Sequence, residues 1–174
     1  MTPEKTSSCL IIVGHSHTME IALLADHTEA IDTLAAWYAR EWEPYYGRQG
    51  PGDARADLIS RCNRDQLPIG MVVFDGSRIC GTAALDRDAI TGLTPSVVGL
   101  LVAKNRRRKG VARMLIDSAG RITQALDYDE LFMSTSILGE MLLHEGWSEQ
   151  GEVDFLNGER GRVYVRSLAR TRNA

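Results

Sequence analysis

The residues best suited to chemistry in this sequence are a basic run that ends in a glycine, Arg107–Gly110. The run follows an apolar stretch, Val97–Val102, after a short polar loop, and an amphipathic pattern begins at Val111. This order predicts a buried strand, a tight basic turn and the first turn of a helix. A helix N-terminus leaves about four backbone N–H groups without intrahelical partners and carries roughly half a positive charge. Phosphates bind at such ends, so we expect a phosphorylated ligand here and therefore an enzyme. The alternative is that the charges only solvate a turn.

The thiols and imidazoles suggest no second centre. The three cysteines, Cys9, Cys62 and Cys80, form no CxxC pair, so neither a zinc site nor a disulfide framework is predicted. Free thiols are typical of a reducing compartment, and we expect a cytoplasmic protein. His15 and His17 have no further metal ligands at a suitable spacing. We therefore expect no metal.

Composition limits the class of protein. The chain has 174 residues, of which 44% are hydrophobic and 25% charged, with a net charge of −3. We expect one domain over 1–174, with a core at about 19–167 and an N-terminal extension at 1–18. A nucleic-acid-binding domain would normally be basic, so no nucleic-acid partner is expected. No apolar stretch has the length of a membrane-spanning helix, so no membrane partner is expected either.

The elements that must position the basic turn follow from periodicity and turn residues. We expect strands at 19–25, 71–74, 79–85, 96–102, 130–134, 153–156 and 162–165, and helices at 27–42, 53–63, from 110 onward and at 137–144. Asp26 and Glu29 form a capping-box pattern, and Pro44 is expected to end the first helix. Strands that both alternate with helices and follow one another predict an α/β fold with a mixed (α+β) sheet and helices on both faces. The unit at 96–134 should be a right-handed parallel crossover.

The hexapeptide Arg107–Ala112 matches the pattern Q/R-x-x-G-x-G/A. It follows the strand predicted to end at Val102 and opens the next predicted helix. This resembles the acetyl-CoA-binding motif of the general N-acetyltransferase (GNAT) superfamily. The order of elements and the pair Gly146-Trp147 also resemble that family, over about residues 19–167. The resemblance implies a mostly antiparallel central sheet with one splayed parallel strand pair, and acetyl-CoA as the acyl donor.

The resemblance also implies how the donor is held. Backbone N–H groups between Arg107 and Ala112, including that of Val111, would bind the pyrophosphate, and Gly110 would let the backbone come close. The side chains of Arg107, Arg108 and Lys109 would add positive charge.

The pantetheine arm of the donor would pair with the motif strand. The resemblance implies that it pairs with the backbone of Leu100, Leu101 and Val102, where this strand splays from the strand at 131–134. Backbone N–H groups exposed by the splay would polarise the thioester carbonyl.

The sequence departs from the family at two positions. The usual acidic base is replaced by Val98, and the tyrosine that usually protonates the leaving thiolate is replaced by Leu142. The catalytic residues are therefore unknown. Ser134, at the end of the strand beside the cleft, and His144, on the fourth helix, are weak candidates. Each is also explained as an ordinary polar residue at the end of its element.

The acceptor is open as well. Tyr45 and Tyr46 lie in the loop that usually walls the acceptor pocket, and Glu41 would attract a cationic amine; packing and solvation are the alternatives. We expect an N-acetyltransferase in which a primary amine attacks acetyl-CoA directly in a ternary complex. The amine could belong to a small molecule or to a protein N-terminus, since Leu67-Pro68 and Thr94-Pro95 resemble features of the branch that acetylates N-termini. The alternative function is a non-catalytic acyl-CoA-binding module. The sheet edge at the C-terminal hairpin makes a homodimer possible.

Overall fold

A computed structural model describes residues 18–169, which form a seven-stranded sheet in the order β1-β2-β3-β4-β5-β7-β6. The strands are β1 (Met19–Leu23), β2 (Ile69–Asp75), β3 (Arg78–Asp86), β4 (Ser96–Val102), β5 (Glu130–Thr135), β6 (Ser148–Asp154) and β7 (Arg160–Ser167). The helices are α1 (Ile31–Glu41), α2 (Glu43–Tyr46), α3 (Ala54–Ser60), α4 (Val111–Ala125) and α5 (Gly139–His144), with 3₁₀ turns η1 (Leu24–Asp26), η2 (Thr28–Ala30) and η3 (Lys104–Arg106). Cys9, His15, His17 and the predicted extension up to residue 17 lie outside the described residues.

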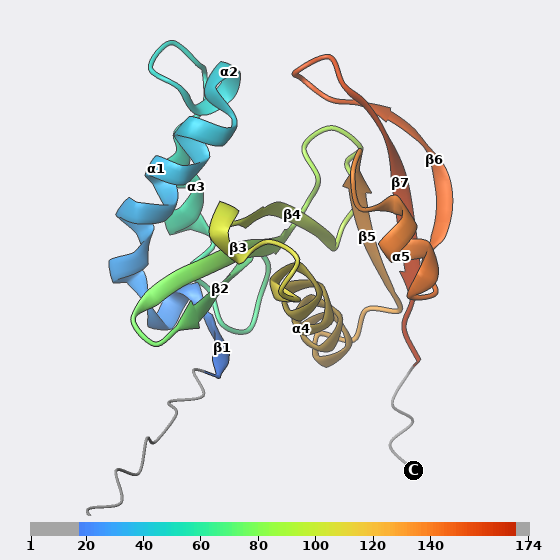
Figure 1. The fold of residues 1–174 in the computed structure, drawn as a ribbon. Helices are drawn as coiled ribbons and strands as arrows, with labels where there is room; N and C mark the ends of the chain where they lie inside the picture. The colour runs from blue at the N-terminus through green and yellow to red at the C-terminus, as the bar shows by residue number, and fades with distance from the viewer. Residues whose placement is uncertain (1–17, 170–174) are drawn as a thin grey trace, which may run out of the picture.

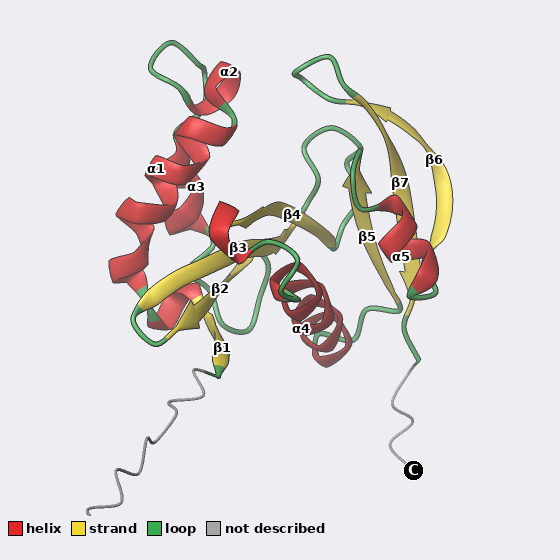
Figure 2. Ribbon diagram, viewed as in Figure 1, coloured by secondary structure: helices red, strands yellow, loops and turns green. Residues whose placement is uncertain are grey.

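The sheet is mixed, as predicted. All neighbouring strands are antiparallel except β4 and β5, which are parallel and joined through α4. Figure 2 shows β1–β4 on one side of the molecule and β5–β7 on the other, with β4 and β5 diverging between them. The sheet therefore consists of a first arm, β1–β4, and a second arm, β5–β7, which meet at the parallel pair β4–β5.

Two apolar cores hold helices against opposite faces of the sheet. On one face, α4 and α5 bury Leu115, Ile116 and Leu142 in a core that continues onto both arms of the sheet. On the other face, α1 and α3 bury Leu34, Tyr38 and Leu58 against the first arm (Figure 1). The prediction of helices on both faces is confirmed. Buried apolar surface on this scale supplies the main driving force that fixes the two arms.

The predicted start of the first helix is wrong, whereas α1 ends at Glu41, one residue before the predicted end. Residues 28–30 form η2, and α1 begins after Ala30, whose side chain makes no capping hydrogen bond. Asp26 does not cap this helix, because its carboxylate pairs with Arg64 on the surface. Pro44 is not what ends α1, because it lies in the first turn of α2, where the missing proline N–H costs no hydrogen bond.

The turn signals performed better than the boundaries. Asp53 Oδ1 accepts a hydrogen bond from Ala56 N at 2.9 Å and caps α3, although α3 ends earlier than the predicted 63. Gly76, Gly146 and Gly158 all have positive φ, at the ends of the elements they were expected to close. The strand β6 was underestimated because its alternate residues are mostly exposed and polar, which leaves no apolar period to read. It forms an edge of the sheet; the homodimer stays a prediction.

Candidate active site

The basic turn between β4 and α4 has a constrained backbone. Arg108 has φ 59° and Gly110 has φ 82°, so two residues of the turn are left-handed. For a residue with a Cβ, this conformation costs roughly 1–2 kcal/mol. A Cβ built on Gly110 would meet no heavy atom within 4 Å, so the space above it is open. Gly110 is therefore required by its backbone angle, and the open space leaves room for a ligand.

The N-terminus of α4 presents its backbone donors to that space. Its first intrahelical bond runs from Met114 N to Gly110 O at 3.0 Å, so the N–H groups of Val111, Ala112 and Arg113 precede the helical ladder. No side chain caps this end of α4. An uncapped N-terminus next to a left-handed turn has the donor arrangement that anions bind.

The basic residues of the turn divide into two groups. Arg106 is largely buried and pairs with Asp75, at the end of β2, with a nitrogen–oxygen distance of 2.7 Å. Arg107, Arg108 and Lys109 are exposed, and the Arg107 Nε donates a hydrogen bond to Val102 O at 3.3 Å. Arg106 thus fastens the turn to the sheet, whereas the other three charges remain available to an anion.

Replacing Arg106 with Ala is expected to lower the free energy of unfolding by about 2–3 kcal/mol, because it leaves the Asp75 carboxylate buried without this cation. Acetyl-CoA affinity should fall with it, since the turn loses its attachment to β2. Urea unfolding and calorimetric titration with acetyl-CoA measure the two effects. Arg121→Ala is the control, because Arg121 is exposed farther along α4; an equal loss in both variants would contradict the role given to Arg106.

The splay predicted between β4 and β5 is present. The two strands pair only at Ser96 with Phe132 and at Val97 with Met133. Beyond these pairs β4 continues to Val102 along β3 alone, so its edge toward β5 has no strand partner there (Figure 2). The backbone of residues 100–102, predicted to bind the pantetheine arm, lies along this free edge and leads directly to the basic turn.

The positions of the missing acid and base carry no titratable group. Leu142 is 0% exposed in the core between α5 and the sheet, and Val98 lies opposite Ala84 in the β3–β4 pair. Ser134 is half-buried one residue beyond the last parallel pair, at the opening of the splay. His144 is exposed at the end of α5. Of the two weak catalytic candidates, only Ser134 is brought to the splay.

The acceptor candidates cluster where α1 meets α2 (Figure 1). The Tyr46 hydroxyl donates a hydrogen bond to Asp57 Oδ2 at 2.7 Å, and burial, with this carboxylate, raises the pKa of Tyr46 above its usual range. Tyr46 therefore joins α2 to α3. Tyr45 packs edge-on against Tyr46 with ring centroids 4.7 Å apart and is itself exposed, as is Glu41. Tyr45 and Glu41 are the members of this set that can meet a ligand freely.

Two polar residues beside the free edge of β4 were missed. Tyr38 lies within the helix predicted at 27–42 and Arg61 within the helix predicted at 53–63, and neither was predicted to belong to the site. The structure buries both and places them at Gly99, whose carbonyl accepts a hydrogen bond from the Tyr38 hydroxyl at 2.8 Å. Gly99 inside an apolar strand was the available signal, because such a glycine often marks a bulge or a close approach.

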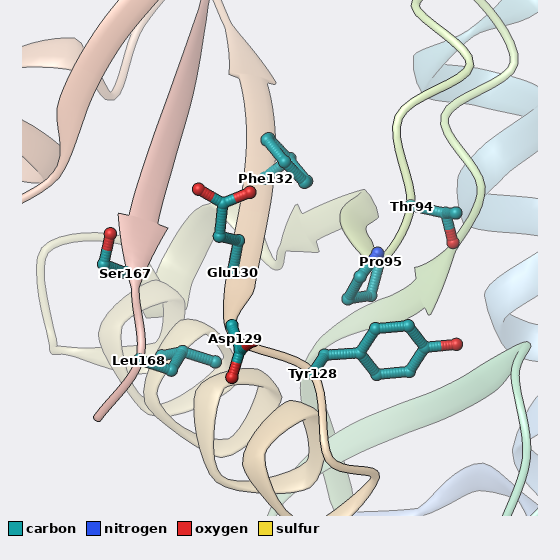
Figure 3. A pocket seen from close by; sticks show the side chains of 8 residues that line it. All are labelled: Thr94, Pro95, Tyr128, Asp129, Glu130, Phe132, Ser167 and Leu168. Atoms are coloured by element: carbon teal, nitrogen blue, oxygen red, sulfur yellow. The ribbon is translucent and has the colours of Figure 1, made fainter. Parts of the chain in front are cut away.

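Two open pockets flank the second arm. One, of about 600 Å³, lies beside the starts of β4 and β5, at the closed end of the splay. Figure 3 shows Phe132 of β5 on the side of Thr94 and Pro95, with Glu130 lower on the same strand. The other, of about 660 Å³, lies between α5 and the β6–β7 pair and includes Thr135 and Ser136. Thr135 Oγ1 accepts hydrogen bonds from Ile137 N and Leu138 N, so it orders the entry to α5. Neither pocket contains a residue predicted to bind the donor.

Residues 18–169 contain no group of three or more His, Cys, Asp or Glu side chains placed to hold a metal ion. No helix in this part of the chain is long and apolar enough to cross a membrane.

Comparison with known proteins agrees with this geometry. The model of the Acetyltransferase (GNAT) family matches residues 31–137, more than half of the chain. No curated protein sequence matches it. An aminoglycoside 6'-N-acetyltransferase from Enterococcus faecium superimposes with a TM-score of 0.67 at 12% identity, over 86% of this chain and 97% of that one. A GNAT acetyltransferase from Streptococcus pneumoniae gives 0.63 at 13% identity, over 87% and 100%. A 6'-N-acetyltransferase complexed with coenzyme A gives 0.67 at 12%, over 86% and 97%. At these identities the likeness establishes the fold.

Proposed function

Because this chain belongs to the acetyltransferase (GNAT) family, we propose that it transfers the acetyl group of acetyl-CoA to a primary amine. Acetyl-CoA is the acyl donor of this family. The observation that carries the proposal is one continuous surface: the free edge of β4 leads into the uncapped N-terminus of α4.

The donor fits this surface group by group. The pyrophosphate would lie on the N–H groups of Val111 and Ala112, over Gly110, where a side chain would otherwise intrude. The exposed side chains of Arg107, Arg108 and Lys109 would balance its charge. The pantetheine arm would extend along Leu100–Val102, as a strand pairs with a sheet edge. The thioester would then lie in the splay, close to Gly99 and Ser134.

The transfer needs little from side chains at that point. A cationic acceptor first gives one proton to water. The lone pair of the neutral amine then forms a bond to the thioester carbonyl carbon, and the carbonyl oxygen gains negative charge. The C=O bond re-forms as the C–S bond breaks and sulfur leaves as a thiolate. Backbone N–H groups of β4 stabilise the oxygen, and holding both reactants in one complex removes much of the entropic barrier. A free thiol has a pKa of about 8.5, so the thiolate can leave and take a proton from water without an acid at Leu142. The amine releases its excess proton to water.

The acceptor side favours a cationic amine. Glu41 and Glu43 are exposed at the junction of α1 and α2 beside the exposed ring of Tyr45, and carboxylates with an aromatic face attract ammonium groups. A small-molecule amine and a protein N-terminus both have this charge, and both remain acceptors to test. The cytoplasmic location and the homodimer also stay predictions.

A second candidate function is a non-catalytic acyl-CoA-binding module. The observation that favours it is the pair Leu142 and Val98, which leaves both usual proton-transfer positions without a titratable group.

Steady-state release of coenzyme A thiol, measured with a panel of amines and N-terminal peptides, separates the two functions. We expect turnover with at least one cationic amine and an acetylated product of the matching mass. Tight binding of acetyl-CoA without turnover on any acceptor would support the module. Absence of acetyl-CoA binding would overturn both.

A further inference from the structure

The β4 strand contains a bulge next to the point where it leaves β5. In the β3–β4 pair, Ala84 lies opposite Val98 and Thr82 opposite Leu101. Two residues of β4, Gly99 and Leu100, therefore lie opposite one residue of β3, Ala83. Gly99 has φ 59°, a left-handed conformation that favours glycine.

The bulge is held by a buried phenol. Tyr38, on α1, is 1% exposed, and its hydroxyl donates a hydrogen bond to Gly99 O at 2.8 Å. A Cβ on Gly99 would collide with this hydroxyl, so the absence of a side chain there is what lets the phenol reach the carbonyl. Burial raises the pKa of Tyr38 above its usual value, which keeps the phenol protonated and able to donate.

The hydrogen bond from Tyr38 to the Gly99 carbonyl determines where the N–H of Leu100 points. The Gly99 carbonyl and the Leu100 N–H belong to one trans peptide group, in which the C=O and N–H point in opposite directions. Because Tyr38 holds the carbonyl from the side of α1, the Leu100 N–H points away from α1. A hydrogen bond accepted by the carbonyl also polarises the amide and strengthens its N–H as a donor.

A buried cation stands behind the phenol. Arg61 is 8% exposed, and its Nη1 lies 3.5 Å from the Tyr38 oxygen. Its Nε is 3.6 Å from Asp86 Oδ2 and, among residues 18–169, has no hydrogen-bond partner, so the two groups form an ion pair without a hydrogen bond at this nitrogen. The backbone of Arg61 is fixed to the sheet, since its carbonyl accepts a hydrogen bond from Gly70 N at 2.7 Å. A guanidinium at the phenol oxygen makes the hydroxyl a stronger donor.

We propose that Arg61 and Tyr38 are positioning residues that polarise the Gly99–Leu100 peptide, so that the Leu100 N–H stabilises the negative charge that develops on the thioester oxygen during acetyl transfer. This inference rests on the proposed function. Tyr38 of α1 and Arg61 at the end of α3 would thus act on acetyl-CoA through one backbone peptide. Tyr38 and Arg61 do not replace the missing acid and base. They strengthen the polarisation of the thioester carbonyl, on which a site without an acid or a base depends.

The test combines turnover with the carbonyl stretch of bound acetyl-CoA, labelled with carbon-13 at the thioester carbonyl and measured by infrared difference spectroscopy without acceptor. Loss of a whole oxyanion donor costs about 100- to 1000-fold in kcat. Tyr38→Phe keeps the Leu100 N–H and removes only the hydrogen bond to the Gly99 carbonyl that polarises it. We therefore expect kcat to fall roughly tenfold. The affinity for acetyl-CoA should change little, and the carbonyl band should move toward its frequency in free acetyl-CoA.

Two further variants keep the test decisive. Tyr38 replaced by 3-fluorotyrosine keeps the ring and hydroxyl in place with a more acidic phenol, so the band should move in the opposite direction even if Tyr38→Phe does not fold. Arg61→Met should move the band in the same direction as Tyr38→Phe, by less. Tyr128→Phe is the matched control, because that phenol is exposed between α4 and β5.

The outcomes distinguish acetyl transfer itself from the positioning role of Tyr38 and Arg61. If the wild type does not bind acetyl-CoA, the proposed function fails and this inference falls with it. If the wild type binds and turns over, but Tyr38→Phe leaves both kcat and the band unchanged, the proposed function stands and Tyr38 only fills space. A band that is unchanged in Arg61→Met alone removes Arg61 from the inference.

Discussion

Gly110→Glu is expected to abolish acetyl-CoA binding while the protein still folds. Gly110 is exposed, and a side chain there points into open space, so the folded state loses only about 1–2 kcal/mol for a side chain at positive φ. The new carboxylate would lie where the pyrophosphate binds. Juxtaposing like charges costs several kcal/mol, so the dissociation constant should rise at least about 100-fold. Calorimetric titration with acetyl-CoA, and thermal unfolding without it, measure the two quantities.

Gly110→Gln is the matched control for this change. Glutamine has the same size and imposes the same backbone cost, but it carries no charge. We expect its affinity for acetyl-CoA to lie between those of the wild type and Gly110→Glu. Equal affinity in the wild type and in both variants would place the pyrophosphate elsewhere.

Gly99→Ala is expected to destabilise the protein strongly. It forces a Cβ into a left-handed position and against the buried Tyr38 hydroxyl, with Arg61 Nη1 only 3.1 Å away. Strain and overpacking together should lower the free energy of unfolding by about 2–4 kcal/mol. Any folded protein should have lost turnover as well, because the bulge must shift. Chemical denaturation and the thiol-release assay report the two losses.

Gly120→Ala is the corresponding control within α4. A Cβ on Gly120 meets nothing within 4 Å outside its own helix. The same chemical change should therefore raise the free energy of unfolding by about 0.5–1 kcal/mol, because alanine favours helix more than glycine does. If the two alanine variants had equal stability, the steric argument for Gly99 would be wrong.

The sequence predicted the features that local chemistry dictates. The strand at 96–102 has the predicted limits, the basic turn lies between it and a helix, and Gly110 and Gly146 have the positive φ that their turns require. These features depend on neighbours in the chain. The first helix was predicted to begin too early because Asp26 matched a capping pattern, and its pairing with Arg64, 38 residues away, could not be read from that pattern.

The support of the site could not be predicted because it depends on long-range contacts. Tyr38 and Gly99 are 61 residues apart, and a tyrosine on the apolar face of a helix is indistinguishable in sequence from one that only packs. In the sequence Arg106 is one more basic residue directly before the run at 107–109, and only its burial against Asp75 distinguishes it from its neighbours. The residues expected to bind acetyl-CoA lie in one short motif, whereas the positioning residues come from elements far apart in the chain.

The bulge in β4 also shifts the phase of the strand. Side chains alternate between faces with period two, so Val97 and Leu101, both odd-numbered, would share a face in a regular strand. Instead Val97 packs in the core beneath α4, and Leu101 packs with α1 on the opposite face. Because of the one extra residue, odd-numbered side chains of β4 lie on the α4 face before the bulge and on the α1 face after it. Deleting Gly99 would remove the extra residue and leave Leu101 opposite Thr82 and Val102 opposite Gly81, so these residues would keep their faces. The strand would then alternate regularly from Val97 to Val102, and the carbonyl that accepts the Tyr38 hydrogen bond would be lost.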